Sequence, residues 1–281
     1  MVEFGRCCYP DHAPPQIRKD IEYEHAGVFF SNKYENRSDL FEQLYVWKEE
    51  KFRRLQGTYP VMFLSFAGIK GTSYADTVLG IKKQISGLYS RYPELTEVLE
   101  KREKETYEKI SDSMEDVEAA YALNFLSTLL ERYYKKNVLI FLDEYDTPLQ
   151  EAYINGYWDE LTAFIRSLFN DTFKTNPSME RAVMTGITRV SRESIFSDLN
   201  NLVVVTTTSD KYAASFGFTE EEVFNAVDEQ GIDPNEKATI KNGMTDLLLE
   251  SMRIFTIHGP SQCILIVVSM DLIGQIPVET D

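Results

Sequence analysis

The feature that most constrains the fold is a run of five apolar residues, 138–142, followed at once by Asp143 and Glu144. A strand that is apolar on both faces is typical of a parallel sheet covered on both sides. Because the acids come directly after the run, they would stand at the carboxyl end of a buried strand. The run therefore predicts an α/β fold with a pair of carboxylates at one edge of the sheet.

Other apolar segments alternate with segments of helical period, which indicates more strands of the same sheet joined through helices. Strands are predicted at 61–66, 181–187 and 202–206, and helices at 38–55, 78–88, 95–111, 115–134 and from Trp158 to Leu168. Thr219 and Glu222 form a capping-box pattern that predicts a further short helix. No internal repeat is present.

Composition narrows the class of protein. The formal net charge is −16, so the surface should repel nucleic acids, and we expect none as a partner. No apolar run reaches the length of a membrane span, and the N-terminus lacks the pattern of a signal peptide. We therefore expect a cytoplasmic protein without a membrane partner.

Cysteine and histidine are confined to the two ends of the chain. The members are Cys7, Cys8, His12, His25, His258 and Cys263. Their spacing fits neither a disulfide framework nor a zinc site. The distribution marks a change of composition at both ends.

The acids after the central run match the Walker B pattern of ATPases. Such a site needs a carboxylate at a strand end to hold Mg²⁺, directly or through water, and an adjacent acid to orient the attacking water. Asp143 is the candidate metal residue and Glu144 the candidate base. The alternative is that solvated acids simply end a buried strand at a turn, which Pro148 would suit.

A second polar segment follows the predicted strand 181–187. Thr185 could sense a terminal phosphate, and Arg189, or else Arg192, could neutralise charge that develops on it. Alternatively, the hydroxyls satisfy a turn and the arginines pair with surface acids. Many ATPases take such an arginine from a neighbouring subunit, so a homo-oligomer is a further expectation.

Together these segments resemble the bacterial AAA-ATPase-like family between Tyr59 and Val223. The matching stretches are YPVMFLSF at 59–66, LDEYDTPL at 142–149, TGITRVS at 185–191, SIFSDLNN at 194–201 and FGFTEEE at 216–222. The resemblance implies a P-loop NTPase-like (AAA/ASCE) parallel sheet with helices on both faces, and ATP and Mg²⁺ as cofactors. Members of the family usually continue into a PD-(D/E)XK nuclease-like domain.

The chain departs from this family at the phosphate-binding loop. No Gly-Lys-Ser/Thr occurs in the 281 residues, whereas the family loop resembles RPRRFGKT. After back-translation and a shift of one base, residues 13–20 can read RPRRFGKT, and residues after about 241 can read family-like sequence. We interpret residues 1–28 and 242–281 as frameshifted segments around an AAA-ATPase-like domain, residues 29–241. The alternative is two native but divergent tails.

This interpretation removes the first strand and the P-loop from the expected fold. That strand is central in the sheet, so its neighbours would have open edges, and marginal stability is expected. Residues 7–10 or 265–268 could substitute for it. The predicted function is ATP binding and hydrolysis, inactive in the chain as written.

Two other functions stay open. One is a non-catalytic interaction module that keeps the ATPase fold. The other is a metal-dependent nuclease using Asp143, Glu144 and Asp146, although no Glu-x-Lys strand follows Asp143.

Overall fold

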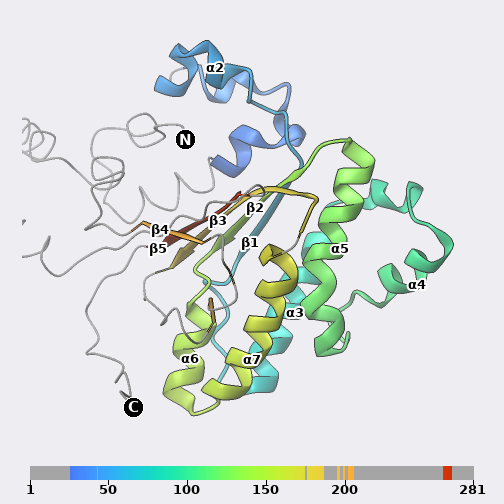
Figure 1. Cartoon of the computed structure of the whole chain (residues 1–281), viewed down its shortest axis with the longest axis vertical. Helices are drawn as coiled ribbons and strands as arrows, with labels where there is room; N and C mark the ends of the chain where they lie inside the picture. Colours follow the sequence, from blue (N-terminus) through green and yellow to red (C-terminus); the bar gives the residue numbers. More distant parts are fainter. Residues whose placement is uncertain are drawn as a thin grey trace, which may run out of the picture.

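The computed structural model describes residues 26–42, 44–174, 176–186, 195–196, 199, 202–205 and 262–267. Its centre is a five-stranded sheet in the order β1-β2-β3-β5-β4 (Figure 1). The strands are β1 (Val61–Ser65), β2 (Val138–Asp143), β3 (Met179–Gly186), β4 (Val203–Val205) and β5 (Gln262–Val267). All neighbouring pairs are parallel, which confirms the predicted α/β fold.

The last strand that the structure describes, β5, lies inside the sheet between β3 and β4. It pairs with β3 from Arg181↔Gln262 to Gly186↔Val267, and with β4 from Val203↔Ile264 to Val205↔Ile266. The expectation that the apolar run in the tail takes a place in the sheet is thus confirmed. The other candidate, residues 7–10, lies outside the described residues.

Six α-helices lie within the described residues, before β1 and between β1 and β3 along the chain. They are α2 (Glu50–Arg53), α3 (Tyr74–Tyr89), α4 (Lys101–Lys109), α5 (Asp116–Tyr134), α6 (Thr147–Asn155) and α7 (Trp158–Phe169). Short 3-10 turns occupy Asn32–Tyr34, Ser38–Leu40, Tyr45–Lys48 and Pro93–Glu97, and a π-helical turn covers Asn170–Lys174. Residues 26–30 are also helical.

Two helix predictions differ from this structure, and one of its helices was not predicted. The helix predicted at 38–55 is wrong, because extended backbone at Leu44 and Glu49 separates the short turns there. The helix predicted at 95–111 divides at Glu100, which caps α4 with a capping box. Helix α6 was not predicted because Pro148 suggested a turn. In the structure this proline lies in the first turn of α6, where it costs no hydrogen bond.

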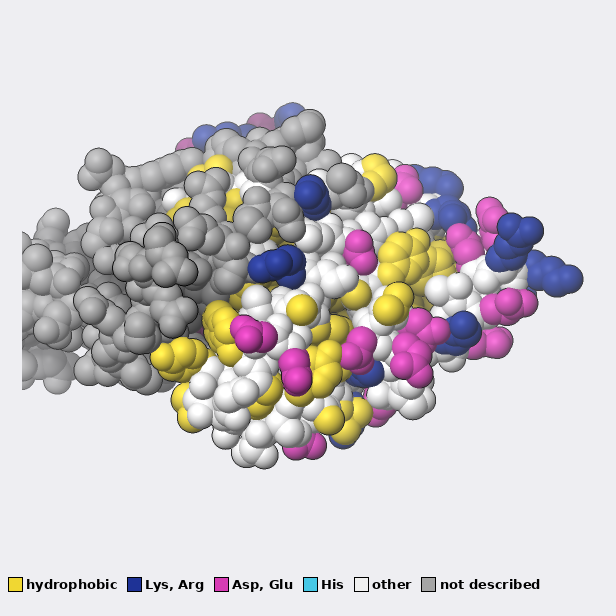
Figure 2. All heavy atoms as spheres, turned by 60° about the horizontal axis from the view of Figure 1, so that its bottom comes forward, with side chains coloured by type: hydrophobic (Ala, Val, Ile, Leu, Met, Phe, Trp, Pro, Cys, Tyr) yellow, Lys and Arg dark blue, Asp and Glu magenta, His cyan; other side chains and the backbone are white. Residues whose placement is uncertain are grey.

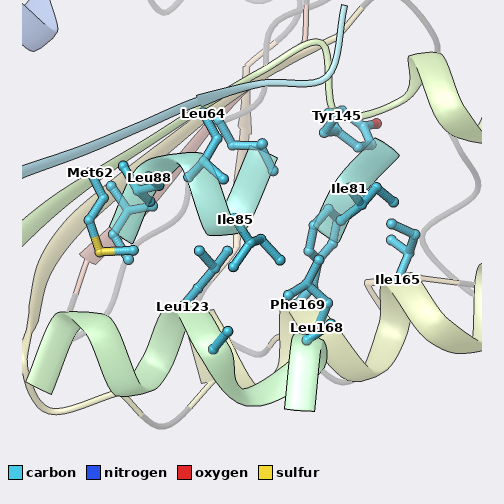
Figure 3. Packing of buried hydrophobic residues seen from close by; sticks show 14 of the residues in the cluster. Met62, Leu64, Ile81, Ile85, Leu88, Leu123, Tyr145, Ile165, Leu168 and Phe169 are labelled. Carbon is cyan, nitrogen blue, oxygen red and sulfur yellow. The ribbon is translucent and has the colours of Figure 1, made fainter. Parts of the chain in front are cut away.

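The main core joins one face of the sheet to α3, α5 and α7. Leu64 of β1, Ile85 of α3 and Leu123 of α5 are almost fully buried and lie near one another in Figure 3. On the other face, Val61, Leu139 and Phe141 form a smaller cluster against Ala26 and Phe30. Residues of β2 alternate between the two clusters, as a strand buried on both faces requires.

Polar contacts join Tyr74 and Lys82 of α3 to Asp116 at the start of α5. Asp116 accepts a hydrogen bond from the Tyr74 hydroxyl (2.5 Å) and pairs with Lys82 Nζ (2.7 Å). Burial would raise the pKa of Asp116, but the bonds from Lys82 and Tyr74 outweigh it and hold that pKa below its ordinary value. Burial and the bond to Asp116 raise the pKa of Tyr74.

Charges on the visible surface are mixed. Figure 2 shows acidic side chains interspersed with basic ones over the described part of one face. None of the helices in the described ranges is long and apolar enough to cross a membrane.

Candidate active site at the carboxyl edge of the sheet

The carboxyl ends of β1, β2 and β3 bring three polar side chains together. Asp143 ends β2 and is the register partner of Ser65, which ends β1. The Ser65 hydroxyl donates to Asp143 Oδ2 (3.2 Å), and the Thr185 hydroxyl of β3 donates to Asp143 Oδ1 (2.5 Å). A hydroxyl from each neighbouring strand therefore orients the Asp143 carboxylate.

The backbone turn after Asp143 is held by β3. Glu144 N–H donates to Thr185 Oγ1 (3.3 Å), and Tyr145 N–H donates to the Thr185 carbonyl (2.9 Å). Glu144 has a φ of 48°, a left-handed conformation that is uncommon outside glycine. Such strain persists only where the surroundings fix it, and it concentrates at functional sites. The Thr185 hydroxyl thus contacts both candidate acids, since it donates to the Asp143 carboxylate and accepts from the Glu144 amide, and the Thr185 carbonyl holds the next residue, Tyr145.

The Glu144 carboxylate is tied to the start of α6. Its Oε2 accepts a hydrogen bond from the Thr147 hydroxyl at 3.0 Å. Both Asp143 and Glu144 are only partly buried, so water reaches this edge of the sheet. Two neighbouring carboxylates therefore lie at this edge: that of Asp143, held by two hydroxyls, and that of Glu144, held by one.

Asp146 occupies a different environment. Its side chain is fully buried, and its Oδ2 accepts a bond from Gln150 Nε2 (3.1 Å). A Cβ built on Gly186 would lie 2.5 Å from Asp146 Oδ1, so only glycine fits the end of β3 there. In the part of the chain that the structure describes, no three acidic, histidine or cysteine side chains form a metal cluster.

A glycine-containing loop, residues 66–73, flanks the acids on the β1 side. Phe66 N–H donates to the Asp143 carbonyl (2.8 Å), and Ala67 N–H donates to Ser65 Oγ (3.3 Å). Tyr157, the N-cap residue of α7, donates its hydroxyl to the Gly71 carbonyl (2.6 Å). The loop ends at Ser73, whose side chain caps α3.

The structure brings together three of the predicted site residues, Asp143, Glu144 and Thr185. The two predicted arginines, Arg189 and Arg192, lie outside the described residues. Sequence reasoning missed Ser65 and Thr147. A signal for Ser65 was present, since a lone hydroxyl ends an otherwise apolar strand.

The residues at this edge fit a divalent cation better than they fit ATP. Asp143 offers a carboxylate at a strand end, a ligand type that Mg²⁺ accepts directly or through water. For the phosphates, P-loop ATPases use a glycine-rich loop ending in Gly-Lys-Ser/Thr, and the 281 residues contain none. Residues Val268 to Asp271, which follow β5, include neither glycine nor lysine. A carboxylate of the type that accepts Mg²⁺ is therefore present at this edge, and the sequence contains no Gly-Lys-Ser/Thr motif for phosphates.

Comparison with known proteins gives one match. The family model described as "Predicted AAA-ATPase" matches residues 19–196, which is more than half of the chain. No match was found among curated proteins or among solved structures. The family match includes Asp143, Glu144 and Thr185, whose contacts are described above. The chain belongs to the AAA-ATPase-like family of predicted AAA-ATPases.

Proposed function

We propose that this chain carries the cation-binding half of a Mg²⁺-dependent ATPase site and that, as written, it does not hydrolyse ATP. The supporting observation is the Asp143 carboxylate, which hydroxyls of Ser65 and Thr185 hold at the carboxyl edge of the sheet. Family membership supports a nucleotide as the natural ligand of the fold. Within this proposal, Asp143 is the metal residue and Glu144 the base.

Three further residues have supporting roles in this proposal. Thr185 would respond to the charge of a bound phosphate, because its hydroxyl already lies between Asp143 and the Glu144 amide. Arg189 is the first choice for neutralising charge on that phosphate and Arg192 the second. Both arginines come a few residues after the end of β3 in the sequence, within the TGITRVS stretch and just after it. Their role is the one that the family resemblance implies.

The lack of turnover follows from the phosphate half of the site. Backbone amides and a lysine normally compensate the charges of the β- and γ-phosphates. In this chain the strand between β3 and β4 is β5, and no Gly-Lys-Ser/Thr follows it. Because the net charge is −16 and the chain has no such loop, it should repel a nucleoside triphosphate.

The interpretation of the two ends as frameshifted is part of the same proposal. Resequencing the gene across the codons for residues 1–30 and 238–281 tests it directly. An extra or missing base would restore an RPRRFGKT loop and predict an active ATPase. An unchanged frame would leave a chain in which ATP binding is undetectable.

Binding and turnover can be measured separately in the purified chain. Mn²⁺, as a paramagnetic substitute for Mg²⁺, should bind the wild type and bind Asp143→Asn at least tenfold more weakly. Asp112→Asn is the matched control, since Asp112 is an exposed acid remote from the site in sequence. Phosphate release from ATP should stay at background in all three proteins. Mg²⁺-dependent release that Glu144→Gln abolishes would show that the chain is an active ATPase and refute the proposal.

A non-catalytic interaction module is the second candidate. The observation in its favour is that residues 262–267 complete the sheet where the family's first strand is expected. The fold would then be retained without the loop that serves turnover.

A further inference from the structure

Strand β5 is held in the sheet by backbone pairing along both edges. All six of its residues have register partners in β3, and three of them also have partners in β4. Since β4 has only three residues, β3 provides most of this pairing. Removing β5 would leave the edge of β3 from Arg181 to Gly186 without a partner strand.

Strand β5 pairs with strands that lie far from it in the sequence. Residues 206–261 separate it from β4, and residues 187–261 separate it from β3. Because pairing over such a separation carries a cost in loop-closure entropy, the contacts with β3 and β4 must offset that cost. The strand contacts, and not closeness in the sequence, therefore place β5 in the sheet.

The composition of β5 defines what can pair there. Residues 263–267 are Cys-Ile-Leu-Ile-Val, uncharged and rich in β-branched side chains. Their register partners Ala182 and Met184 in β3 are fully buried. Backbone pairing gives affinity in such strand addition, and the apolar surroundings exclude charged segments.

We propose that the β3 edge opposite β2, together with β4, is a strand-binding site for an uncharged, apolar segment in parallel register. Its resident occupant is this chain's own residues 262–267, and the site accepts the same segment in trans. This proposal concerns sheet completion and does not rest on the proposed ATPase function; it applies to the chain whose reading frame resequencing leaves unchanged over residues 242–281.

A strand bound at the strand-binding site should also affect the positions of Asp143 and Glu144. Thr185 pairs with Ile266, and on its other side it contacts Asp143 and the turn at Glu144. A partner strand on β3 therefore fixes the residue that orients both acids. Loss of β5 should therefore loosen the turn after β2 through Thr185.

The first experiment introduces proline into β5 of the full chain. Leu265→Pro removes an amide hydrogen from the middle of a strand paired on both sides. Hydrogen exchange measured by mass spectrometry should accelerate at least tenfold in residues 181–186 and stay unchanged in α5. Gln262→Pro is the matched control, because the first position of a strand tolerates proline. Unchanged exchange in β3 of Leu265→Pro would overturn the proposal.

The second experiment restores the strand in trans. A peptide of residues 262–267 with flanking lysines for solubility is added to Leu265→Pro under reducing conditions. Slow exchange in residues 181–186 should return, whereas a peptide N-methylated at the Leu265 position should have no effect. Rescue is decisive even if Leu265→Pro unfolds in part, because refolding on peptide addition supports the site. Failure of the unmodified peptide to restore protection would overturn it.

Discussion

Thr185 Oγ1 lies between the two candidate acids, donating to Asp143 Oδ1 at 2.5 Å and accepting from the Glu144 amide at 3.3 Å. One hydroxyl on β3 therefore fixes the carboxylate of one acid and the backbone of the next. Because Thr185 is almost fully buried, water cannot readily replace it. The acidic edge depends on β3 as much as on β2, which carries it.

Thr185→Val should destabilise the chain by about 1–3 kcal/mol, because it removes the hydroxyl partner of a partly buried amide and of a partly buried carboxylate oxygen. Valine keeps the shape of threonine, so the loss reports the hydroxyl. Thr185→Ser retains the hydroxyl and should lose less. Urea denaturation followed by circular dichroism measures both. Equal stability of Thr185→Val and wild type would show that the hydroxyl does not support the turn.

Gly186→Ala should be among the most destabilising small substitutions, at about 1–3 kcal/mol or more. Its Cβ would lie 2.5 Å from Asp146 Oδ1 and 2.6 Å from Tyr145 Cε1, and both side chains are buried. Gly87→Ala is the matched control, since nothing lies within 4 Å of a Cβ there. In helix α3 that change should add up to about 1 kcal/mol of stability. Thermal melts of the two variants should therefore move in opposite directions.

The sheet was predictable because its strands are continuous apolar runs. The runs around Leu64, Ile140 and Ala182 each became a strand close to the predicted limits. The acids at 143 and 144 were predictable for the same reason, since a strand end fixes their place. Periodicity failed between 38 and 55, where Phe41 and Val46 are buried against Phe29 from separate turns and not along one helical stripe.

Contacts between strands could not be read from the sequence. Ser65 and Thr185 are remote from Asp143 along the chain, and only the register of the sheet brings them to it. The strained backbone of Glu144 likewise has no signal in its residue type. Residues 265–268 were one of two candidates to replace the first strand, because apolar character indicates a strand but not its neighbours.

Tyr157→Phe should loosen the loop at residues 66–73. The Tyr157 hydroxyl donates to the Gly71 carbonyl and also bonds with Thr77 Oγ1 at 2.9 Å, within a buried region. We expect a loss of about 1–2 kcal/mol and faster hydrogen exchange in the loop. Tyr153→Phe is the control, because Tyr153 is exposed on α6. A loop equally protected in both variants would contradict the prediction.

Glu103 and Arg132 should make part of the stability depend on pH. Two hydrogen bonds join them, Arg132 Nη1 to Glu103 Oε2 (2.7 Å) and Nη2 to Oε1 (2.9 Å). The hydrogen bond from Arg132 outweighs burial and holds the pKa of Glu103 below its ordinary value of 4.5. A carboxyl whose pKa is lower in the folded state stabilises that state above the unfolded pKa.

Glu103→Gln should therefore cost about 0.5–1 kcal/mol at pH 7. The difference from wild type should shrink as the pH falls below 4.5 and through the lower folded pKa. Glutamine can still serve the capping box at Glu100, so helix α4 should persist. Glu108→Gln, an exposed change on the same helix, is the control. Urea denaturation between pH 3 and pH 7 gives the comparison, and a difference that stays constant over this range would show that the pair contributes no pH dependence.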